Sequence, residues 1–413
     1  MVEPAWSRRL LYCAAAALAS VQIVPRLAVD YGADGDARRS AAAALHLAAT
    51  GSYAPSRLPG NPLFEGVLAI LVPWGGHVAS NTFVASSYVA AIFAFFRTAR
   101  PLPSRPVLTA LFALTPTVVV NAATTMDYMP GLALLLWTYA LVSEGHLRAG
   151  AVLLGLATGF RITNVLFGLP LAGFVLMRGV APGRVARLGG AALALAAAIY
   201  LPVIHRCAEM LEMPRSSAPF SAYASATAAR FTGIVGLPAI GALVCFVALD
   251  RRRITAARSR MPRPELVAEG GAIAVFSAMF ALHSDERDYL LPVVPFVLLQ
   301  IGRSLAPRRM PVLLACVLSP ALVVLDPRPG AGLERGLIAT DYQKRAAMLE
   351  LRANIAREVT PEPAVLLTGL GPVLTHENPA LQRVDRAALG SLSTRPGSRS
   401  RRTSTASAAE TSF

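Results

Sequence analysis

Apolar runs of about twenty residues recur along the whole chain, and this feature limits its fold more than any other. About twenty residues is the length that a helix needs to cross the hydrocarbon core of a bilayer. Only 15% of the 413 residues are charged and 54% are hydrophobic, whereas a soluble globular domain carries roughly 25% charged residues. The sequence therefore predicts an all-α polytopic membrane protein.

Length and apolarity predict about eleven transmembrane helices. The expected spans are 10–28, 80–96, 107–122, 128–142, 149–160, 162–177, 185–204, 231–249, 266–282, 289–305 and 312–325. The first has a second interpretation as a cleaved signal peptide, because basic residues precede a short apolar stretch that ends in Ala17-Leu18-Ala19. The apolar run continues past Ser20, which favours a retained helix.

The net charge of +15 comes almost entirely from arginine, and the arginines cluster in short links between apolar runs. With a cytoplasmic N-terminus, these clusters all fall on one side: Arg8, Arg9, Arg97, Arg100, Arg105, Arg148, Arg178, Arg184, Arg187, Arg251, Arg252, Arg253, Arg258, Arg260, Arg263, Arg303, Arg308 and Arg309. Arginine-rich short loops belong on the cytoplasmic side. We therefore expect a multi-pass plasma (inner) membrane protein with an extracytoplasmic C-terminal tail, and no nucleic-acid partner.

This topology divides the chain into three parts. Residues 1–325 form the transmembrane domain, with a first extracytoplasmic loop at 29–79. Residues 326–389 form a small extracytoplasmic segment, with an amphipathic helix at 341–357 and a strand and turn at 363–379. Residues 390–413 are rich in Ser, Thr and Arg, a composition typical of disorder. The cysteines Cys13, Cys207, Cys245 and Cys316 form no CxxC pair, which argues against a disulfide framework or a metal knuckle.

The first extracytoplasmic loop is too patterned to be a simple connector. Residues 36–50 have helical character and end at Gly51, a helix stop. The rigid turn "SYAPSRLPGNP" follows, and then "LFEGVLAILVPWGG", which is apolar but too short to span. These segments predict helices that lie along the outer membrane surface with an apolar face in lipid.

Several charged residues gather on the predicted outer side. Asp30, Asp34 and Asp36 precede the first surface helix, and Asp127 lies in "TTMDYMP". The stretch "HSDERDYLLPVVP" places His283, Asp285, Glu286, Arg287 and Asp288 at the start of an apolar helix. Arg161 interrupts an apolar stretch, and an ionisable group there indicates a cavity or a partner.

These motifs resemble those of GT-C glycosyltransferases, the superfamily of protein O-mannosyltransferases and aminoarabinose transferase. The first-loop residues that carry the resemblance are Asp36, Ala43, Leu45, Thr50-Gly51, Tyr53, Ser56-Arg57, Pro59-Gly60 and Pro62. "ERDYLLPVVP" resembles a later motif of the family, and Asp127 and Arg161 resemble two further positions. The resemblance implies a membrane hexosyl- or pentosyltransferase of the cell envelope. Such an enzyme moves a sugar from a polyprenyl-phosphate carrier to a glycan, lipid or protein acceptor on the extracytoplasmic face, with inversion.

This reaction needs cations, because the leaving polyprenyl phosphate gains charge as the glycosidic bond breaks. Arg287, Arg57 and Arg161 are candidates for binding the donor phosphate, since a guanidinium group clamps phosphate through two hydrogen bonds. Tyr289 joins them through the family motif. Arg287 has an alternative role as a snorkelling residue paired with an adjacent acid, and Tyr289 as an interfacial anchor.

The reaction also needs a carboxylate to orient or deprotonate the acceptor hydroxyl. Asp36, Asp34 and Asp127 are the catalytic candidates, and Asp36 with Asp127 are candidate ligands for a divalent cation, Mg or Mn. Ala37 stands where many family members have a Glu after the first-loop Asp, and this difference weakens the expectation of a metal. Asp36 has an alternative role as the N-cap of its helix, and Asp34 as a turn residue.

Two other function classes compete with a transferase. A transporter or lipid flippase usually places charges near the bilayer midplane, whereas here the acidic residues crowd one face and Arg161 alone interrupts a span. An O-antigen ligase or polymerase usually has its long outer loop late in the chain, whereas the patterned loop here is the first. We therefore expect a one-sided transferase site.

Overall fold

A computed structural model describes residues 5–57, 59–207, 236–260, 262–282, 287–325 and 333–359. The chain divides into two units, Met1–Leu351 and Arg352–Phe413. All contacts discussed below lie within the first unit. The expected strand and turn at 363–379 and the tail at 390–413 fall outside the described residues, as does 326–332 of the small extracytoplasmic segment.

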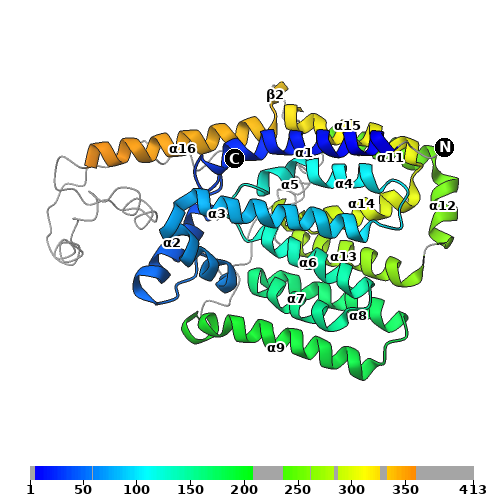
Figure 1. The fold of residues 1–413 in the computed structure, drawn as a ribbon, viewed down its shortest axis with the longest axis horizontal. Coiled ribbons are helices and arrows are strands. Elements are labelled where there is room, and N and C mark those ends of the chain that lie inside the picture. The colour runs from blue at the N-terminus through cyan, green and yellow to red at the C-terminus, as the bar shows by residue number, and fades with distance from the viewer. Residues whose placement is uncertain are drawn as a thin grey trace. The chain divides into compact units, whose positions relative to one another are not determined.

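Helices make up nearly all of the described chain (Figure 1). They are α1 (Ala5–Leu27), α2 (Gly35–Thr50), α3 (Pro62–Thr98), α4 (Arg105–Leu114), α5 (Pro116–Asn121), α6 (Tyr128–Ser143), α7 (Leu147–Phe160), η1 (Ile162–Phe167), α8 (Gly168–Met177), α9 (Pro182–Cys207), α11 (Leu237–Leu249), α12 (Arg251–Arg260), α13 (Arg263–Leu282), η3 (Arg287–Leu290), α14 (Val293–Ser304), η4 (Pro307–Arg309), α15 (Met310–Leu322) and α16 (Leu337–Val359). Two three-residue strands, β1 (Val323–Leu325) and β2 (Leu333–Arg335), pair antiparallel with Val323 opposite Arg335.

The apolar helices support the prediction of a membrane protein, but they do not confirm the predicted number of eleven transmembrane helices. Among the residues that the structure describes, four helices are long and apolar enough to cross a bilayer: Arg9–Leu27, Pro62–Thr98, Pro182–Ile204 and Arg263–Leu282. Six further apolar helices in the described part have 10–17 residues. Breaks explain the short lengths. For example, α4 ends at Leu114 and Thr115 leaves the helical conformation (ψ 124°), because a residue that precedes proline, here Pro116, is disfavoured in that conformation.

Helix α3 joins two segments that the sequence analysis separated, the surface helix expected over "LFEGVLAILVPWGG" and the span at 80–96. The helix changes direction at Gly75 (φ −144°, ψ 16°) and Gly76 (φ 56°, ψ −141°). Gly76 adopts a positive φ that a residue with a side chain rarely tolerates. The two glycines therefore separate the two expected segments by a bend, although the chain passes from one to the other without an intervening loop.

The core lies around α6, most of whose residues are buried. Helices α3 and α7 pack against α6 (Figure 1). The Tyr139 ring contacts the rings of Phe167, Phe174 and Phe296 edge-on at centroid distances of 6.2, 5.8 and 5.6 Å. These contacts tie α6 to η1, α8 and α14.

Ion pairs gather at one end of these helices. Arg97 at the end of α3 pairs with Glu144 at the end of α6, and Arg178 at the end of α8 donates to Glu265 in the first turn of α13 (2.8 Å). Arg303 at the end of α14 donates to the buried Glu269 (2.6 Å). The arginine-rich links therefore meet at one end, as the topology requires, while the side of the membrane that this end faces remains a prediction.

Candidate functional site

A buried carboxylate lies at the opposite end of the helices, where α6 begins. Asp127 is the N-cap residue of α6 and its side chain is fully buried. Its Oδ2 accepts from Nη1 of Arg161 at 2.7 Å, and its Oδ1 accepts from Nη2 of Arg57. The structure thus brings together three residues that the sequence analysis named, from segments 34 and 70 positions apart.

Hydrogen bonds to α3 and to the α1–α2 loop hold the turn before Asp127. The Thr125 backbone N–H donates to the Tyr31 carbonyl at 2.7 Å, and its hydroxyl donates to Oδ1 of Asn81 at 2.8 Å. The Asn81 amide in turn donates to the Asp30 carbonyl at 2.8 Å. Asp30 is buried with φ at 61°, and its carboxylate accepts from Arg38 at 3.0 Å. Asp127 is therefore fixed by a chain of satisfied polar contacts rather than held on a loose loop.

Arg161 ends α7 in an extended conformation (φ −152°, ψ 115°), and its side chain is 8% exposed. Its Cζ lies 4.0 Å from the centroid of the Tyr128 ring and 4.4 Å from that of Tyr289. Aromatic rings attract a guanidinium group at such distances. The expectation that Arg161 has a partner is confirmed, and the structure also brings Tyr289 to this cluster.

Arg57 links Asp127 to Asp36. Its Nη1 donates to Oδ2 of Asp36 at 2.8 Å, and its side chain is 17% exposed. Asp36 also accepts from Arg39 at 2.9 Å, and its own side chain is 13% exposed. Asp36 is thus the carboxylate of the pair that solvent reaches. We call Asp36, Arg57, Asp127 and Arg161 the four-residue ion network.

Asp34, and not Asp36, caps α2. The Asp34 side chain accepts from the Asp36 backbone N–H at 2.9 Å, and Asp34 has the extended conformation of an N-cap (φ −82°, ψ 140°). The alternative in which Asp36 is the N-cap is wrong, because the cap falls two residues earlier in "DGD". The helix stop predicted at Gly51 is confirmed, and Gly51 adopts the left-handed conformation (φ 66°). Asp34 as a catalytic residue remains only a prediction.

The loop that carries Arg57 is shaped by Glu65, which the sequence analysis passed over. Glu65 lies in the first turn of α3 and is 1% exposed. Its carboxylate accepts from the Tyr53 hydroxyl and from the Ser56 backbone N–H (2.8 Å). Gly60 closes the loop with φ at 91°, and a Cβ there would lie 2.6 Å from the Tyr53 hydroxyl oxygen. A carboxylate inside the apolar "LFEGVL" is the signal that could have identified Glu65.

Part of the charged stretch at 283–288 lies outside the described residues. The structure does not describe residues 283–286 or the side chain of Arg287, so the role of Arg287 as a donor-phosphate ligand remains a prediction. Asp288 is described, and its Oδ1 accepts from the Asn121 amide at 2.9 Å and from the Thr117 hydroxyl at 3.3 Å. These bonds tie this stretch to α5, next to the turn that holds Asp127.

The arginines decide the charge state of Asp127. Burial alone would raise the pKa of this carboxyl group, but Arg57 and Arg161 more than offset it and hold the pKa of Asp127 below its ordinary value. Asp127 is therefore ionised at neutral pH. A carboxylate of lowered pKa with both oxygens engaged is a weak base, and it suits the orientation of two arginines better than proton transfer.

The candidate metal ligands do not fit a divalent cation in this arrangement. Asp36 and Asp127 are joined through Arg57 rather than facing each other, and each of their four carboxylate oxygens accepts from a guanidinium group. Among the described residues, no three His, Cys, Asp or Glu side chains gather as metal ligands. We therefore assign no step to Mg or Mn.

A second buried ion network joins the expected amphipathic helix to the same end. Asp341 in α16 accepts from Arg26 of α1 (3.0 Å) and from Arg345 (2.8 Å). Arg345 is fully buried and also donates to the Ala123 carbonyl at 2.5 Å and to the Thr124 hydroxyl at 2.6 Å. The first turns of α16 thus hold the turn that leads to Asp127.

Neither a protein-family model nor a curated protein matches the sequence. Solved structures have a similar fold: ArnT from Cupriavidus metallidurans in the apo state, and the same protein bound to undecaprenyl phosphate. Each is 18% identical to this chain, and the match covers 90% of this chain and 75% of that chain with a TM-score of 0.55. The chain therefore has an ArnT-like fold, the GT-C-like fold that its motifs predicted.

Proposed function

We propose that this chain is a membrane glycosyltransferase that transfers a sugar from a polyprenyl-phosphate carrier to an acceptor hydroxyl. The four-residue ion network is the observation that carries the proposal. It concentrates two arginines and two carboxylates at one end of an apolar helix bundle, where a lipid-linked donor enters from the membrane. The ArnT structure bound to undecaprenyl phosphate supports this class of donor for a chain of similar fold.

Arg57 and Arg161 are assigned to the donor phosphate. Both are held by Asp127, and Arg161 is further held between two tyrosine rings. Hydrogen-bond donors that are already held in place stabilise the charge that develops in the transition state, and they do not have to reorganise when the reaction occurs. Here that charge appears on the phosphate oxygen as the bond from the sugar C1 to this oxygen breaks.

Asp36 is assigned to the acceptor. Its side chain is partly exposed, whereas that of Asp127 is fully buried. In the proposed step, the acceptor oxygen attacks C1 from the face opposite the phosphate, and its proton passes to the Asp36 carboxylate. The products are the glycosylated acceptor, with inverted configuration at C1, and polyprenyl phosphate. Asp36 exchanges its contact with Arg39 for the acceptor hydroxyl, because Arg39 is exposed and easily displaced.

The orientation of the site follows from the same proposal. The network lies at the end opposite to the arginine-rich links, so these links face the cytoplasm and the site faces outward. A lipid-linked donor fits that side, where nucleotide sugars are absent. A transporter is less well supported, because these charges lie at helix ends rather than along a pathway through the bundle.

The test is transfer of label in membranes that contain the full-length chain. Radiolabelled polyprenyl-phosphate hexoses and pentoses are supplied one at a time, and label is followed into lipid, glycan and protein fractions. We expect one donor to give label that Arg161→Gln abolishes while the variant is inserted in equal amount. Equal label from wild-type, Arg161→Gln and empty membranes with every donor would refute the proposal.

A further inference from the structure

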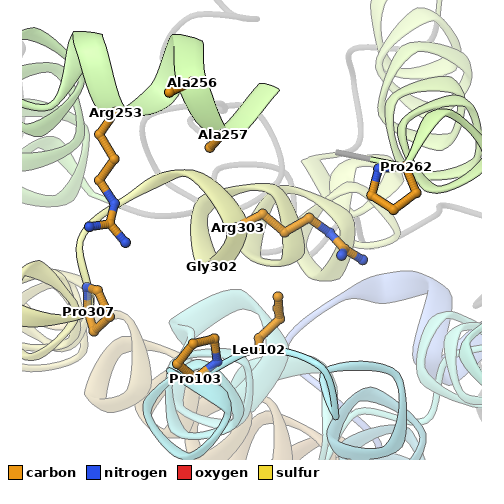
Figure 2. A pocket seen from close by; sticks show the side chains of 9 residues that line it. All are labelled: Leu102, Pro103, Arg253, Ala256, Ala257, Pro262, Gly302, Arg303 and Pro307. Atoms are coloured by element: carbon orange, nitrogen blue, oxygen red, sulfur yellow. The ribbon is translucent and has the colours of Figure 1, made fainter. Parts of the chain in front are cut away.

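A cavity of about 500 Å³ lies at the arginine-rich end, away from the four-residue ion network (Figure 2). It is bounded by the α3–α4 link, α12, the start of α13 and the end of α14. Most of its wall is apolar, including Leu102, Pro103, Ala257 and Pro307. Two arginines, Arg253 and Arg303, complete the lining. The cavity is thus an apolar surface with guanidinium groups at its sides.

The charge of one arginine is balanced by a carboxylate, and that of the other is not. Arg303 donates to the buried Glu269 through Nε at 3.2 Å and Nη2 at 2.6 Å, so its charge is balanced. Arg253 is exposed, and no carboxylate of the described chain pairs with it. Figure 2 shows Arg253 descending from α12 toward Pro307, while Arg303 extends from α14 toward Pro262. The cavity therefore has one positive charge in excess.

Helix α12 adds to this positive charge. Its sequence "RRRITAARSR" carries five arginines and no acid, and it lies between apolar α11 and the apolar span of α13. The cavity consequently lies at the ends of the apolar helices α11, α13 and α14, where the expected topology places lipid headgroups. Positive-inside topology explains basic residues at this level, but it does not require a cavity beside them.

We infer that this cavity binds the headgroup of an anionic phospholipid, with the phosphate on Arg253 and the start of the acyl chains on the apolar wall. Free phosphate shares the anionic chemistry but would make no use of Leu102, Pro103 or Pro307. A zwitterionic lipid would bring a cation to a site that already has excess positive charge. Basic pockets between membrane helices on the cytoplasmic side are suited to anionic headgroups.

The test is native mass spectrometry of the full-length chain purified from vesicles of phosphatidylglycerol and phosphatidylcholine. We expect one phosphatidylglycerol to remain bound, and Arg253→Gln to reduce its retention about fivefold, the effect of one arginine near an anionic surface. Arg252→Gln is the matched control, because it removes the same charge from the same helix outside the cavity. Ala257→Phe fills the cavity without changing charge and should also displace the lipid.

Three results would overturn the inference. Equal loss in Arg252→Gln and Arg253→Gln would reveal general attraction to a basic surface. Retention of lipid in both Arg253→Gln and Ala257→Phe would place the lipid elsewhere. Displacement of phosphatidylglycerol by millimolar inorganic phosphate would identify a site for a soluble anion. Thermal unfolding of each variant distinguishes loss of lipid from loss of fold, and none of these readouts depends on transferase activity.

Discussion

Removing the charge of Asp127 tests the ion network at its centre. Asp127→Asn keeps the shape of the side chain but leaves Arg57 and Arg161 facing a neutral group. Loss of one partner from a buried ion pair costs about 3–5 kcal/mol. Because Arg161 and Arg57 are 8% and 17% exposed, solvent recovers part of this cost. We expect the free energy of unfolding to fall by about 3 kcal/mol, the lower end of that range.

A double-mutant cycle assigns this loss to individual pairs. Arg57 keeps Asp36 when Asp127 is neutralised, whereas Asp127 is the one carboxylate of the described chain that pairs with Arg161. The coupling of Asp127 with Arg161 should therefore exceed that with Arg57, within the range of about 0.5–3 kcal/mol expected of contacting residues. Reversible denaturant unfolding in detergent micelles measures the free energy of unfolding of wild type, Asp127→Asn, Arg161→Gln and the double variant. A coupling below about 0.5 kcal/mol, the usual limit of additivity, would refute the pairing.

Three further predictions follow from the same contacts. Asp36→Asn should lower the transfer rate about a hundredfold, which corresponds to about 3 kcal/mol of barrier. Asp34→Asn should keep the wild-type rate, because Asn caps a helix as well as Asp. Similar rates for the two variants would contradict the assignment of Asp36. The stabilisation by Asp127 should be constant from neutral pH down to about 3.9, the ordinary pKa of an aspartate, and be lost as pH falls through the lowered pKa of Asp127 in the folded state. The difference in unfolding free energy between wild type and Asp127→Asn should therefore not change above about pH 5. Arg345→Gln should lower kcat more than it raises the KM for the sugar donor, because loss of the hydrogen bond to the Ala123 carbonyl loosens the turn before Asp127 and leaves the contacts to the sugar donor in place. An unchanged kcat would limit α16 to a structural role.

Much of the helical layout could be predicted from apolar length. The end of α2 at Gly51 and the beginning of α6 at Tyr128 agree with their sequence signals, because each depends on residues within one or two turns. The position of the α2 cap was wrong by two residues, because "DGD" offers two acidic caps and the choice depends on backbone conformation. The change of direction in α3 at Gly75 and Gly76 agrees with the expected boundary between the segment that ends in "WGG" and the span at 80–96, since glycine permits such a break.

The candidate site could be predicted residue by residue but not as an arrangement. An arginine in an apolar stretch needs a partner, and this identified Arg161 without identifying Asp127 as the partner. The contact of Arg26 with Asp341 joins positions 315 apart, and no local pattern encodes such a pair. Glu65 was missed because its role depends on the path of the loop from Tyr53 to Gly60, which the α3 and α9 packing sets.

The central claim is that this end of the protein cleaves a sugar from a polyprenyl phosphate. Phosphorus NMR of purified protein in detergent, supplied with the polyprenyl-phosphate sugar and acceptor chosen from the labelling screen, follows the conversion of phosphodiester to phosphomonoester directly. We predict acceptor-dependent appearance of polyprenyl phosphate with wild-type protein and none with the Asp36→Asn and Arg161→Gln double variant. Phosphomonoester formed at the same rate by the double variant, or none formed by folded wild-type protein, would contradict the account.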